Sequence, residues 1–283
     1  MLCRILLDNI MNSYLGKSGS NLKLELKNDI FYVKKISKDK RFENQIIKQL
    51  NFNEDLFFSK PKIYSFESID DEYICNMEYI KGIDPMIYFC NSSSKDLDIF
   101  CDKIIYFINN QINLSKFEKF NIKILIDKLE LINIDTALKN KIFDYINKKY
   151  INKSILIPVG SCHGDFTLSN MLFLEKVYLI DFLDSFYESP IQDIVKIRQD
   201  TKYYWITKIY DSKKDIDFLK IKINLNYIDK KLTNYFDNFF WYKDLYNIFQ
   251  LFNMIRIIPY LNYNKDKEIY NFLLKNIELL LLE

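Results

Sequence analysis

The first eighty residues show the alternation of apolar and polar positions that is typical of β-strands. The alternation is clearest in three stretches: residues 22–26, 30–36 and 72–80. Residues 1–15 and 39–50 instead carry apolar residues at helical spacing. Asn28-Asp29 separates the first two strands and has the composition of a tight turn. This part of the chain is predicted to form a small antiparallel sheet with a helix between its strands.

The rest of the chain has a different pattern, with apolar residues at every third or fourth position from residue 95 onward. Helices are expected in three stretches: residues 95–112, residues 121–150 and most of 201–283. Pro158 and Gly160 interrupt the pattern, and a short hairpin is expected at residues 171–180. The segment between the helical stretches is therefore the least regular part of this half.

Lys81-Gly82 ends the last predicted strand, and no Pro/Gly-rich linker follows it. The change of pattern at this point predicts an α+β fold with two lobes. The N-terminal sheet lobe is assigned to residues 1–81, and the larger, mainly helical lobe to residues 82–283. The connection between them is expected to be a hinge rather than a flexible tether.

Composition supports a folded core and narrows the class of partners. Hydrophobic residues make up 49% of the 283 residues, and the formal net charge is only +2, so no strong field for nucleic acid is expected. No uncharged run approaches the roughly 20 residues that a membrane span needs, and the N-terminus lacks a signal-peptide cleavage site. Five scattered cysteines and a single histidine argue against a zinc site and predict a cytoplasmic protein.

The polar residues of segment 161–200 have the spacing that phosphoryl transfer requires. His163-Gly164-Asp165 is followed by Asn170, and Asp181 comes directly after an apolar strand. Mg²⁺ prefers oxygen ligands, which Asn170 and Asp181 can supply. A separate carboxylate, Asp165, is then left to accept the proton of an attacking hydroxyl. A helix cap for Asp165 and a turn for Asn170 are the structural alternatives.

Three motifs in this segment, HGDFTLSN, LIDF and QDIVKIRQD, together resemble the aminoglycoside phosphotransferase and choline kinase branch of the protein-kinase-like superfamily. They match its HGDxxxxN loop, its metal-binding aspartate and the helix that follows. The resemblance is strong over about forty residues. It implies the two-lobed kinase-like fold, ATP and Mg²⁺ as cofactors, Asp165 as the catalytic residue, and Asn170 and Asp181 as metal ligands.

The resemblance also assigns residues to the nucleotide: Lys35, Ser18, Gly19, Ser20, Glu78 and Ile80. Lys34 and Lys35 lie on opposite faces of one strand, and similarity favours Lys35 as the ligand of the α- and β-phosphates. The small-residue turn at 16–20 is expected over the phosphates, although an ordinary hairpin turn also fits. Backbone groups of Glu78 and Ile80 are expected at the adenine edge.

The sequence GKS at residues 16–18 also invites a P-loop interpretation, which we reject. Met11 stands where a P-loop has its first glycine, and a strand-like pattern rather than a helix follows. A P-loop nucleotidase remains a third hypothesis, and substitution of Lys17 tests it separately. Glu43 is expected either to pair with the strand lysine or to be a surface charge.

Other polar residues of the segment have roles that the sequence leaves open. The resemblance implies that His163 supports the metal-binding segment and transfers no proton. Asp193 is interpreted as a helix cap that also orients the catalytic loop. Asp184 is either a second metal contact or an ordinary loop acid. Thr167 stands where protein kinases usually have lysine, and no A-P-E segment follows Asp181, so a protein kinase is disfavoured.

The acceptor is expected to bind to the C-terminal helices. Their aromatic residues either form a core or make a cage for a quaternary ammonium group. Arg198 and Arg256 either bind an anionic or sugar-phosphate group or pair with a carboxylate. We therefore predict an ATP-dependent kinase for a hydroxyl of a small molecule such as a sugar, a sugar phosphate or a choline-like alcohol. An aminoglycoside phosphotransferase, which the lack of an acidic cluster disfavours, and a non-catalytic kinase-like binding module are the alternatives.

Overall fold

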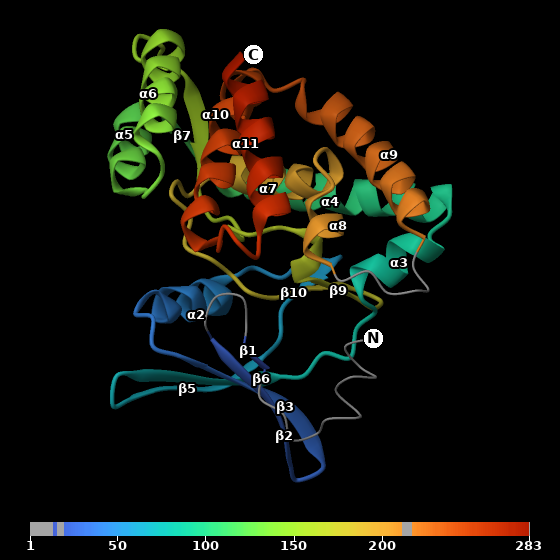
Figure 1. The fold of residues 1–283 in the computed structure, drawn as a ribbon. Helices are drawn as coiled ribbons and strands as arrows, with labels where there is room; N and C mark the ends of the chain where they lie inside the picture. The colour runs from blue at the N-terminus through green and yellow to red at the C-terminus, as the bar shows by residue number, and fades with distance from the viewer. Residues whose placement is uncertain (1–13, 16–19, 211–216, 283) are drawn as a thin grey trace.

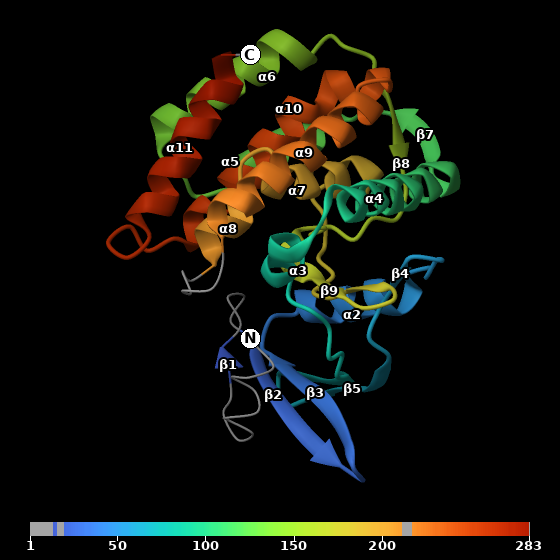
Figure 2. The same cartoon turned by 90° about the vertical axis from the view of Figure 1, so that its right-hand side faces the viewer.

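A computed structural model of the chain describes residues 14–15, 20–210 and 217–282 and has two lobes (Figure 1). A β-sheet forms the N-terminal lobe, and a larger group of helices forms the C-terminal lobe. Figure 2 shows the same division after a quarter turn, with the sheet at one end and the helices at the other. The predicted α+β architecture with two lobes is confirmed.

Within the described residues, the N-terminal sheet has five strands, and all neighbouring strands are antiparallel. Their spatial order is β1 (Tyr14–Leu15), β2 (Asn21–Lys27), β3 (Ile30–Ser37), β6 (Glu72–Glu78) and β5 (Ile63–Ile69). Asn28 and Asp29 have φ angles of 51° and 61°, which suit the tight turn between β2 and β3. Most of the helix predicted at residues 1–15 lies outside the described residues, and its last two residues form β1.

Helix α2 (Arg41–Asn51) follows β3, in agreement with the helix predicted at residues 39–50. Phe42 and Ile46 lie one turn apart on its buried face and form a small hydrophobic cluster with Cys75 of β6. Figures 1 and 2 both show α2 between the sheet and the helical lobe. The helix therefore links the N-terminal sheet to the region where the catalytic residues are expected.

A second sheet connects the two lobes. In the described chain it has three strands, in the order β4 (Phe58–Ser59), β10 (Val177–Leu179) and β9 (Met171–Phe173). Strands β9 and β10 form the hairpin predicted at residues 171–180, and β4 pairs with β10 in parallel. Ile83, in the connection between the lobes, exchanges backbone hydrogen bonds of 2.8 and 3.1 Å with Phe173. The hairpin thus supports the connection that was predicted as a hinge.

The C-terminal lobe is built around helix α7 (Pro190–Thr201), which is buried along nearly its whole length. Ser189 caps this helix by accepting a hydrogen bond from the Ile191 N–H, and Pro190 occupies its first turn. Three long helices pack around it: α4 (Ser94–Leu114), α9 (Phe218–Phe236) and α10 (Phe240–Ile255). The central helix of the lobe, α7, is therefore the one that follows the predicted metal-binding segment.

The remaining elements complete the C-terminal lobe. They are α3 (Pro85–Asn91), β7 (Lys116–Lys119), α5 (Ile122–Leu131), α6 (Thr136–Tyr150), β8 (Leu156–Val159), η1 (Leu168–Asn170), α8 (Trp205–Ile209), η2 (Ile258–Tyr260) and α11 (Lys267–Leu282). The helical pattern of residues 121–150 is divided between α5 and α6, because Asp135 caps a new helix by accepting from the Leu138 N–H. Among the described residues, no helix has the length and apolar character that a membrane crossing requires.

Candidate active site

The buried carboxylate of Asp193 holds the start of the loop at residues 163–170. Its two oxygens accept hydrogen bonds from the backbone N–H groups of His163 at 2.7 Å and Gly164 at 2.9 Å. Gln111 of α4 donates a third hydrogen bond at 2.8 Å. Burial raises the pKa of Asp193 to about 6, although these three donors act in the opposite direction. Asp193 lies in the first turn of α7, so this helix fixes the loop in place.

The His163 ring connects the loop to the strand that leads to Asp181. Its Nε2 lies 3.0 Å from the carbonyl oxygen of Ile180, and its Nδ1 accepts a hydrogen bond from the Asp165 N–H at 3.2 Å. The side chain is fully buried, and burial lowers its pKa to about 4. The imidazole is therefore neutral at pH 7, with its proton on Nε2. The two hydrogen bonds of the imidazole ring orient the backbone at Asp165 and at Ile180.

Gly164 is required by the close packing between this loop and the segment after Asp181. Its φ angle of 85° lies in the left-handed region, which disfavours residues with a Cβ. A Cβ at this position would lie only 2.1 Å from the carbonyl oxygen of Leu183. The H-G-D sequence therefore has a glycine for both conformational and steric reasons.

The side chain of Asp165 is held by two neighbours. Lys196 of α7 forms an ion pair with Oδ1 at 2.9 Å, and the Asn170 side-chain amide donates to Oδ2 at 2.9 Å. Burial acts to raise the pKa of Asp165, but the positive charge and hydrogen bond of Lys196 outweigh it, and the pKa is lowered. Asp165 is therefore ionised at neutral pH and able to accept a proton or a hydrogen bond.

Sequence reasoning missed two residues of α7 that contact this loop, Lys196 and Asp200. The Asp200 carboxylate accepts a hydrogen bond from the Leu168 N–H at 2.6 Å, and burial raises its pKa to about 7. Asp193, Lys196 and Asp200 follow the i, i+3, i+7 spacing of one helix face. That spacing was the available signal, because charged side chains on a helix that is buried on its other faces need partners inside the protein.

Lys35 and Asp181, which are 146 residues apart in the sequence, form an ion pair of 2.7 Å. The lysine comes from the central strand β3 and is 9% exposed, whereas the Asp181 side chain is 50% exposed. Lys34 is paired with Asn76 in the sheet register and lies on the opposite face of β3. Glu43 is exposed on α2, which agrees with the surface alternative for this residue.

The residues present suit a magnesium ion that is held mainly through phosphate. The Asn170 Nδ2 atom faces Asp165, so its planar amide directs Oδ1 away from that carboxylate. The Ile180 N–H donates to the Asn170 backbone carbonyl oxygen at 3.0 Å, so Asp181 directly follows a residue that is hydrogen-bonded to Asn170. No cluster of three or more acidic, histidine or cysteine residues that could hold a metal occurs in the described chain. One carboxylate and one amide oxygen are the typical protein share of a Mg²⁺–nucleotide site.

The predicted phosphate-binding turn is only partly described. Ser18 and Gly19 lie outside the described residues. Ser20 is buried and directly precedes β2. Ser20 therefore leads into the strand that pairs with β3, where Leu22 lies opposite Lys35. Its position over the phosphates stays a prediction.

The segment predicted to bind adenine lies where β6 ends. Glu78 is the last residue of β6, and its N–H donates to the carbonyl oxygen of Lys62 at 2.8 Å. Ile80 follows two residues later, outside the strand. The contact of their backbone groups with adenine stays a prediction.

Helix α2 contacts the segment after Asp181 through residues that the sequence did not mark. The Lys48 ammonium lies 2.9 Å from the Leu183 carbonyl oxygen and 2.9 Å from the Glu188 carboxylate. Asn44 donates to the Asp184 carboxylate at 3.3 Å. These contacts tie the N-terminal lobe to the metal-binding segment, and they show a partner for Asp184 on α2.

The two arginines that the sequence left open have different environments. Arg198 forms hydrogen bonds of 2.9 and 3.0 Å with both oxygens of Asp229, and it contacts the Tyr242 hydroxyl at 2.5 Å. It is therefore a buried structural cation. Arg256 instead lies over the Phe186 ring, with its guanidinium carbon 5.3 Å from the ring centre. The largest aromatic side chains of residues 234–249 are buried, which favours the core interpretation of that stretch.

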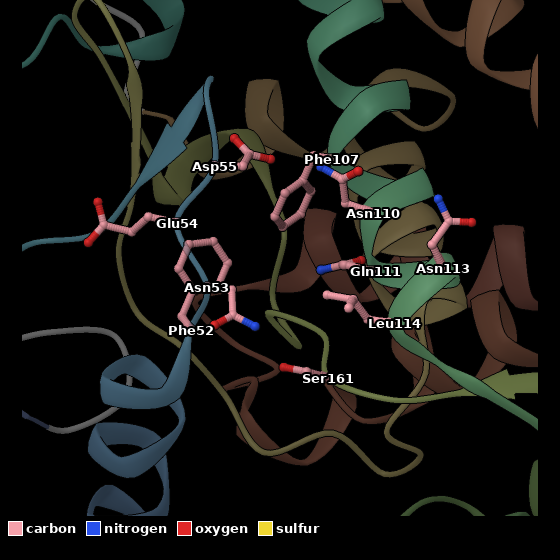
Figure 3. Close-up of a pocket in the computed structure, with 10 residues that line it drawn as sticks. All are labelled: Phe52, Asn53, Glu54, Asp55, Phe107, Asn110, Gln111, Asn113, Leu114 and Ser161. Carbon is pink, nitrogen blue, oxygen red and sulfur yellow. The ribbon is translucent and has the colours of Figure 1, made fainter.

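A cavity of about 300 Å³ lies beside the loop (Figure 3). Its lining residues come from the segment after α2, from α4 and from the start of the loop: Phe52, Asn53, Glu54, Asp55, Phe107, Asn110, Gln111, Asn113, Leu114 and Ser161. Gln111, which also contacts Asp193, is the link between this cavity and the loop. None of the residues predicted from the sequence for catalysis, metal or nucleotide lines it.

Comparison with known proteins gives matches at the level of structure. No protein-family model and no curated protein matches the chain. An apo thermostable mutant of aminoglycoside phosphotransferase APH(4)-Ia is similar over 95% of this chain and 93% of its own, with a TM-score of 0.64 and 7% identity. The chain has the aminoglycoside phosphotransferase fold.

Two further structures with this fold contain substrates. A ternary complex of APH(4)-Ia with AMP-PNP and hygromycin B matches with a TM-score of 0.66 and 8% identity, over 98% of this chain and 97% of its own. The complex of gentamicin with APH(2″)-IIa matches with a TM-score of 0.53 and 18% identity, over 100% of this chain and 95% of its own. At these identities the aminoglycoside phosphotransferase fold is shared over nearly the whole chain, and the kinase-like fold expected from HGDFTLSN and LIDF is confirmed.

Proposed function

We propose that the protein is an ATP- and Mg²⁺-dependent phosphotransferase that moves the terminal phosphoryl group of ATP to a hydroxyl of a small molecule. The observation that carries the proposal is the convergence of four side chains from distant segments. Lys35 contacts Asp181 at 2.7 Å, and Asn170 contacts Asp165 at 2.9 Å. The Asn170 carbonyl and the Ile180 N–H join the two pairs through the backbone.

Each residue has a role that follows from its surroundings. Asp165 has a lowered pKa and is ionised, so it orients the acceptor hydroxyl and accepts its proton. Lys196 keeps this carboxylate charged and fixes its direction. Asn170 and Asp181 would hold Mg²⁺, which supplies charge neutralisation at the phosphates when it is bound.

The nucleotide would be held by both lobes. Lys35 would bind the non-transferred phosphates, and Asp181 would be a ligand of the metal. Residues Ser18, Gly19 and Ser20 cover the triphosphate with backbone N–H groups. The Glu78 carbonyl and the Ile80 N–H contact the adenine edge. Binding of AMP-PNP and ADP by proteins of the same fold supports this assignment.

The comparisons bear on the acceptor class. Hygromycin B and gentamicin occur in complexes with the same fold, which supports the aminoglycoside alternative more than a choline-like alcohol or a sugar. In each case the partner is a small molecule.

The test compares wild-type protein with Asp165→Asn in an assay of ADP formation over a panel of alcohols that includes hygromycin B and gentamicin. Loss of the general base is expected to lower kcat about 10³-fold. Asp127→Asn is the matched control, because Asp127 is an exposed acid of α5 that pairs with Lys123. Equal trace activity of wild type and Asp165→Asn, together with normal AMP-PNP binding, would indicate a non-catalytic binding module. Loss of nucleotide binding in Lys17→Ala but not in Asp181→Ala would instead indicate a P-loop nucleotidase.

A further inference from the structure

The cavity beside the loop at residues 163–170 is lined by side chains that the proposed reaction does not use. Figure 3 shows Phe52 and Asn53 on one side of it and Gln111 on the other, with Ser161 below them. The first two residues follow α2, Gln111 belongs to α4, and Ser161 lies just before the loop. A molecule in this cavity would therefore touch the segment after α2, α4 and the start of the loop at the same time.

One polar group of the Gln111 side chain is engaged, and the other is not. Its Nε2 donates to the Asp193 carboxylate at 2.8 Å. A carboxylate only accepts, so the amide must direct its nitrogen to Asp193 and its oxygen elsewhere. That oxygen, Oε1, is buried and has no hydrogen-bond partner in the described part of the chain. Because an unpaired buried acceptor costs free energy, a hydrogen-bond donor is expected beside it.

Asp55, on the other side of the cavity, has the same asymmetry. Its Oδ1 accepts hydrogen bonds of 2.7 Å from the N–H groups of Phe57 and Phe58. Its Oδ2 is buried and has no partner among residues 14–15, 20–210 and 217–282, since Lys176 donates to the Asp55 backbone carbonyl instead. The two unpaired acceptors belong to different elements that line one cavity, so a ligand with two or more donors suits both.

The other lining residues set the class of ligand. Those that can both donate and accept a hydrogen bond are Asn53, Asn110, Asn113 and Ser161. Glu54 and Asp55 are its charged residues, and within the described chain no lysine, arginine or histidine lines the cavity. An anion would be repelled, and a cation would leave the amide N–H groups without acceptors. A hydroxyl both donates and accepts, and a volume of about 300 Å³ suits a small molecule.

We propose that this cavity binds a neutral polyol of about monosaccharide size, and that the bound polyol strengthens the hold of Asp193 on the loop at residues 163–170. Gln111 is the link between the two. A donor on its Oε1 polarises the amide and strengthens the hydrogen bond to Asp193, which fixes the N–H groups of His163 and Gly164. Binding of the polyol is independent of the proposed function, whereas its effect on turnover rests on that function.

The binding test is a calorimetric titration of the full chain, with and without Mg²⁺ and AMP-PNP. The probes are glucose and myo-inositol as neutral polyols, glucuronate as an anion and glucosamine as a cation. A polyol is expected to bind with a Kd on the order of 1 mM, and glucuronate at least about tenfold more weakly. A crystal soaked in glucose shows whether the sugar occupies this cavity.

The variants locate the site. Asn110→Leu is expected to weaken glucose binding about tenfold or more, because it removes a polar group of the lining. Asn140→Leu is the matched control, since Asn140 is exposed on α6. Asp165→Asn is expected to bind glucose in the cavity as wild type does, which separates this site from the acceptor site. Thermal melting shows whether each variant is folded, and Asn53→Leu repeats the test from the other side of the cavity if Asn110→Leu is not.

Hydrogen exchange tests the link to the loop. Saturating glucose is expected to slow exchange of the His163 and Gly164 amides at least about threefold in wild type and not in Asn110→Leu. Unchanged exchange in wild type with glucose bound would overturn the link.

Three results would overturn the polyol site itself. They are no binding of either polyol, which would mean that water alone fills the cavity, equal binding of glucose by wild type and the folded lining variant, and tighter binding of glucuronate or glucosamine than of any polyol. Absence of AMP-PNP binding or of ADP formation would instead count against the proposed function. The titrations with polyols are read independently of both.

Discussion

The loop that carries Asp165 and the strand that carries Lys35 are held in very different ways. The loop is fixed by hydrogen bonds that its backbone N–H groups donate to the buried carboxylates of Asp193 and Asp200 of α7. The lysine belongs to a thin sheet whose own cluster contains only Phe42, Ile46 and Cys75 among its fully buried members. Asp165, which we propose reacts with the acceptor, is therefore rigidly placed, whereas Lys35, which we propose binds the nucleotide, belongs to a lobe with little core of its own.

Polar side-chain contacts between these two regions include the pairs Lys35–Asp181, Lys48–Glu188 and Asn44–Asp184. The rings of Phe52 and Phe58, which come before and in β4, also pack on Phe182 and Phe166 of the larger core. Local stability follows the density of buried contacts, so the sheet lobe is expected to open at a lower free energy than the loop. Substitutions in the loop should therefore lower stability and turnover together, and substitutions in the sheet lobe should change mainly nucleotide affinity.

The largest expected effect is that of Gly164→Ala in the rigid region. A left-handed φ of 85° and a Cβ only 2.1 Å from the Leu183 carbonyl oxygen should together cost at least about 3 kcal/mol. Gly160→Ala is the comparison at a glycine whose φ is not positive. Its closest neighbour is the Ser115 hydroxyl, which donates to the Gln111 carbonyl oxygen, so a smaller loss is expected there. Urea unfolding measures both variants. A loss below about 1 kcal/mol for Gly164→Ala would contradict the tight packing of the loop.

The second prediction concerns pH and the buried ring of His163. The pKa of this histidine is about 4 in the folded protein and about 6.5 when unfolded, so its contribution to stability is complete above pH 6.5. It is lost as pH falls toward 4, because only the unfolded state then binds the proton. The stability difference between wild type and His163→Gln should shrink by about 3 kcal/mol from pH 7.5 to pH 4.

The comparison with His163→Gln removes the effect of other groups. Burial raises the pKa values of Asp193 and Asp200, so these carboxyls stabilise the fold at low pH, and this contribution is lost as pH rises through about 6 and about 7. Both proteins contain them, and their contribution cancels in the difference. Chemical unfolding at several pH values provides the data. A difference that stays constant with pH would mean that His163 is not buried in a neutral form.

The third prediction tests the sheet lobe. Lys35→Met should weaken binding of Mg²⁺–ATP roughly 10- to 100-fold by removing a charged contact to phosphate. It should change the free energy of unfolding by less than about 1 kcal/mol, because Asp181, its partner, is half exposed. Lys34→Met on the opposite face is the matched control. Equal nucleotide affinity of the two variants, measured by calorimetry, would argue against Lys35 as the phosphate ligand.

The smallest effect is expected at the contact between α2 and the segment after Asp181. Lys48→Met removes hydrogen bonds to Leu183 and Glu188, and the Glu188 side chain is 46% exposed, so about 1 kcal/mol should be lost. Lys38→Met is the control, since its pair with Glu72 lies in solvent. Hydrogen exchange should show faster opening of α2 in Lys48→Met only. Equal exchange in both variants would mean that the Lys48 contact does not couple the lobes.

Local sequence determined much of the architecture. Alternation in 22–26 and 30–36 predicted β2 and β3, the spacing of Phe42 and Ile46 predicted α2, and the hairpin formed where it was expected. These features depend on interactions between residues close in the chain, for which periodicity and turn chemistry are sufficient. The motif HGDFTLSN also indicated which residues belong together, although a motif contains no distances.

Only the tertiary structure decided which charges meet. The sequence does not show that Lys196 reaches Asp165, that Asp200 holds Leu168, or that Lys48 of α2 contacts Glu188, 140 residues away. It also left Arg198 and Arg256 equivalent, and the fold gave a carboxylate to one and an aromatic ring to the other. The reason is physical. Helix and strand patterns record which face of an element is buried, whereas the partner of a buried charge depends on how separate elements pack together.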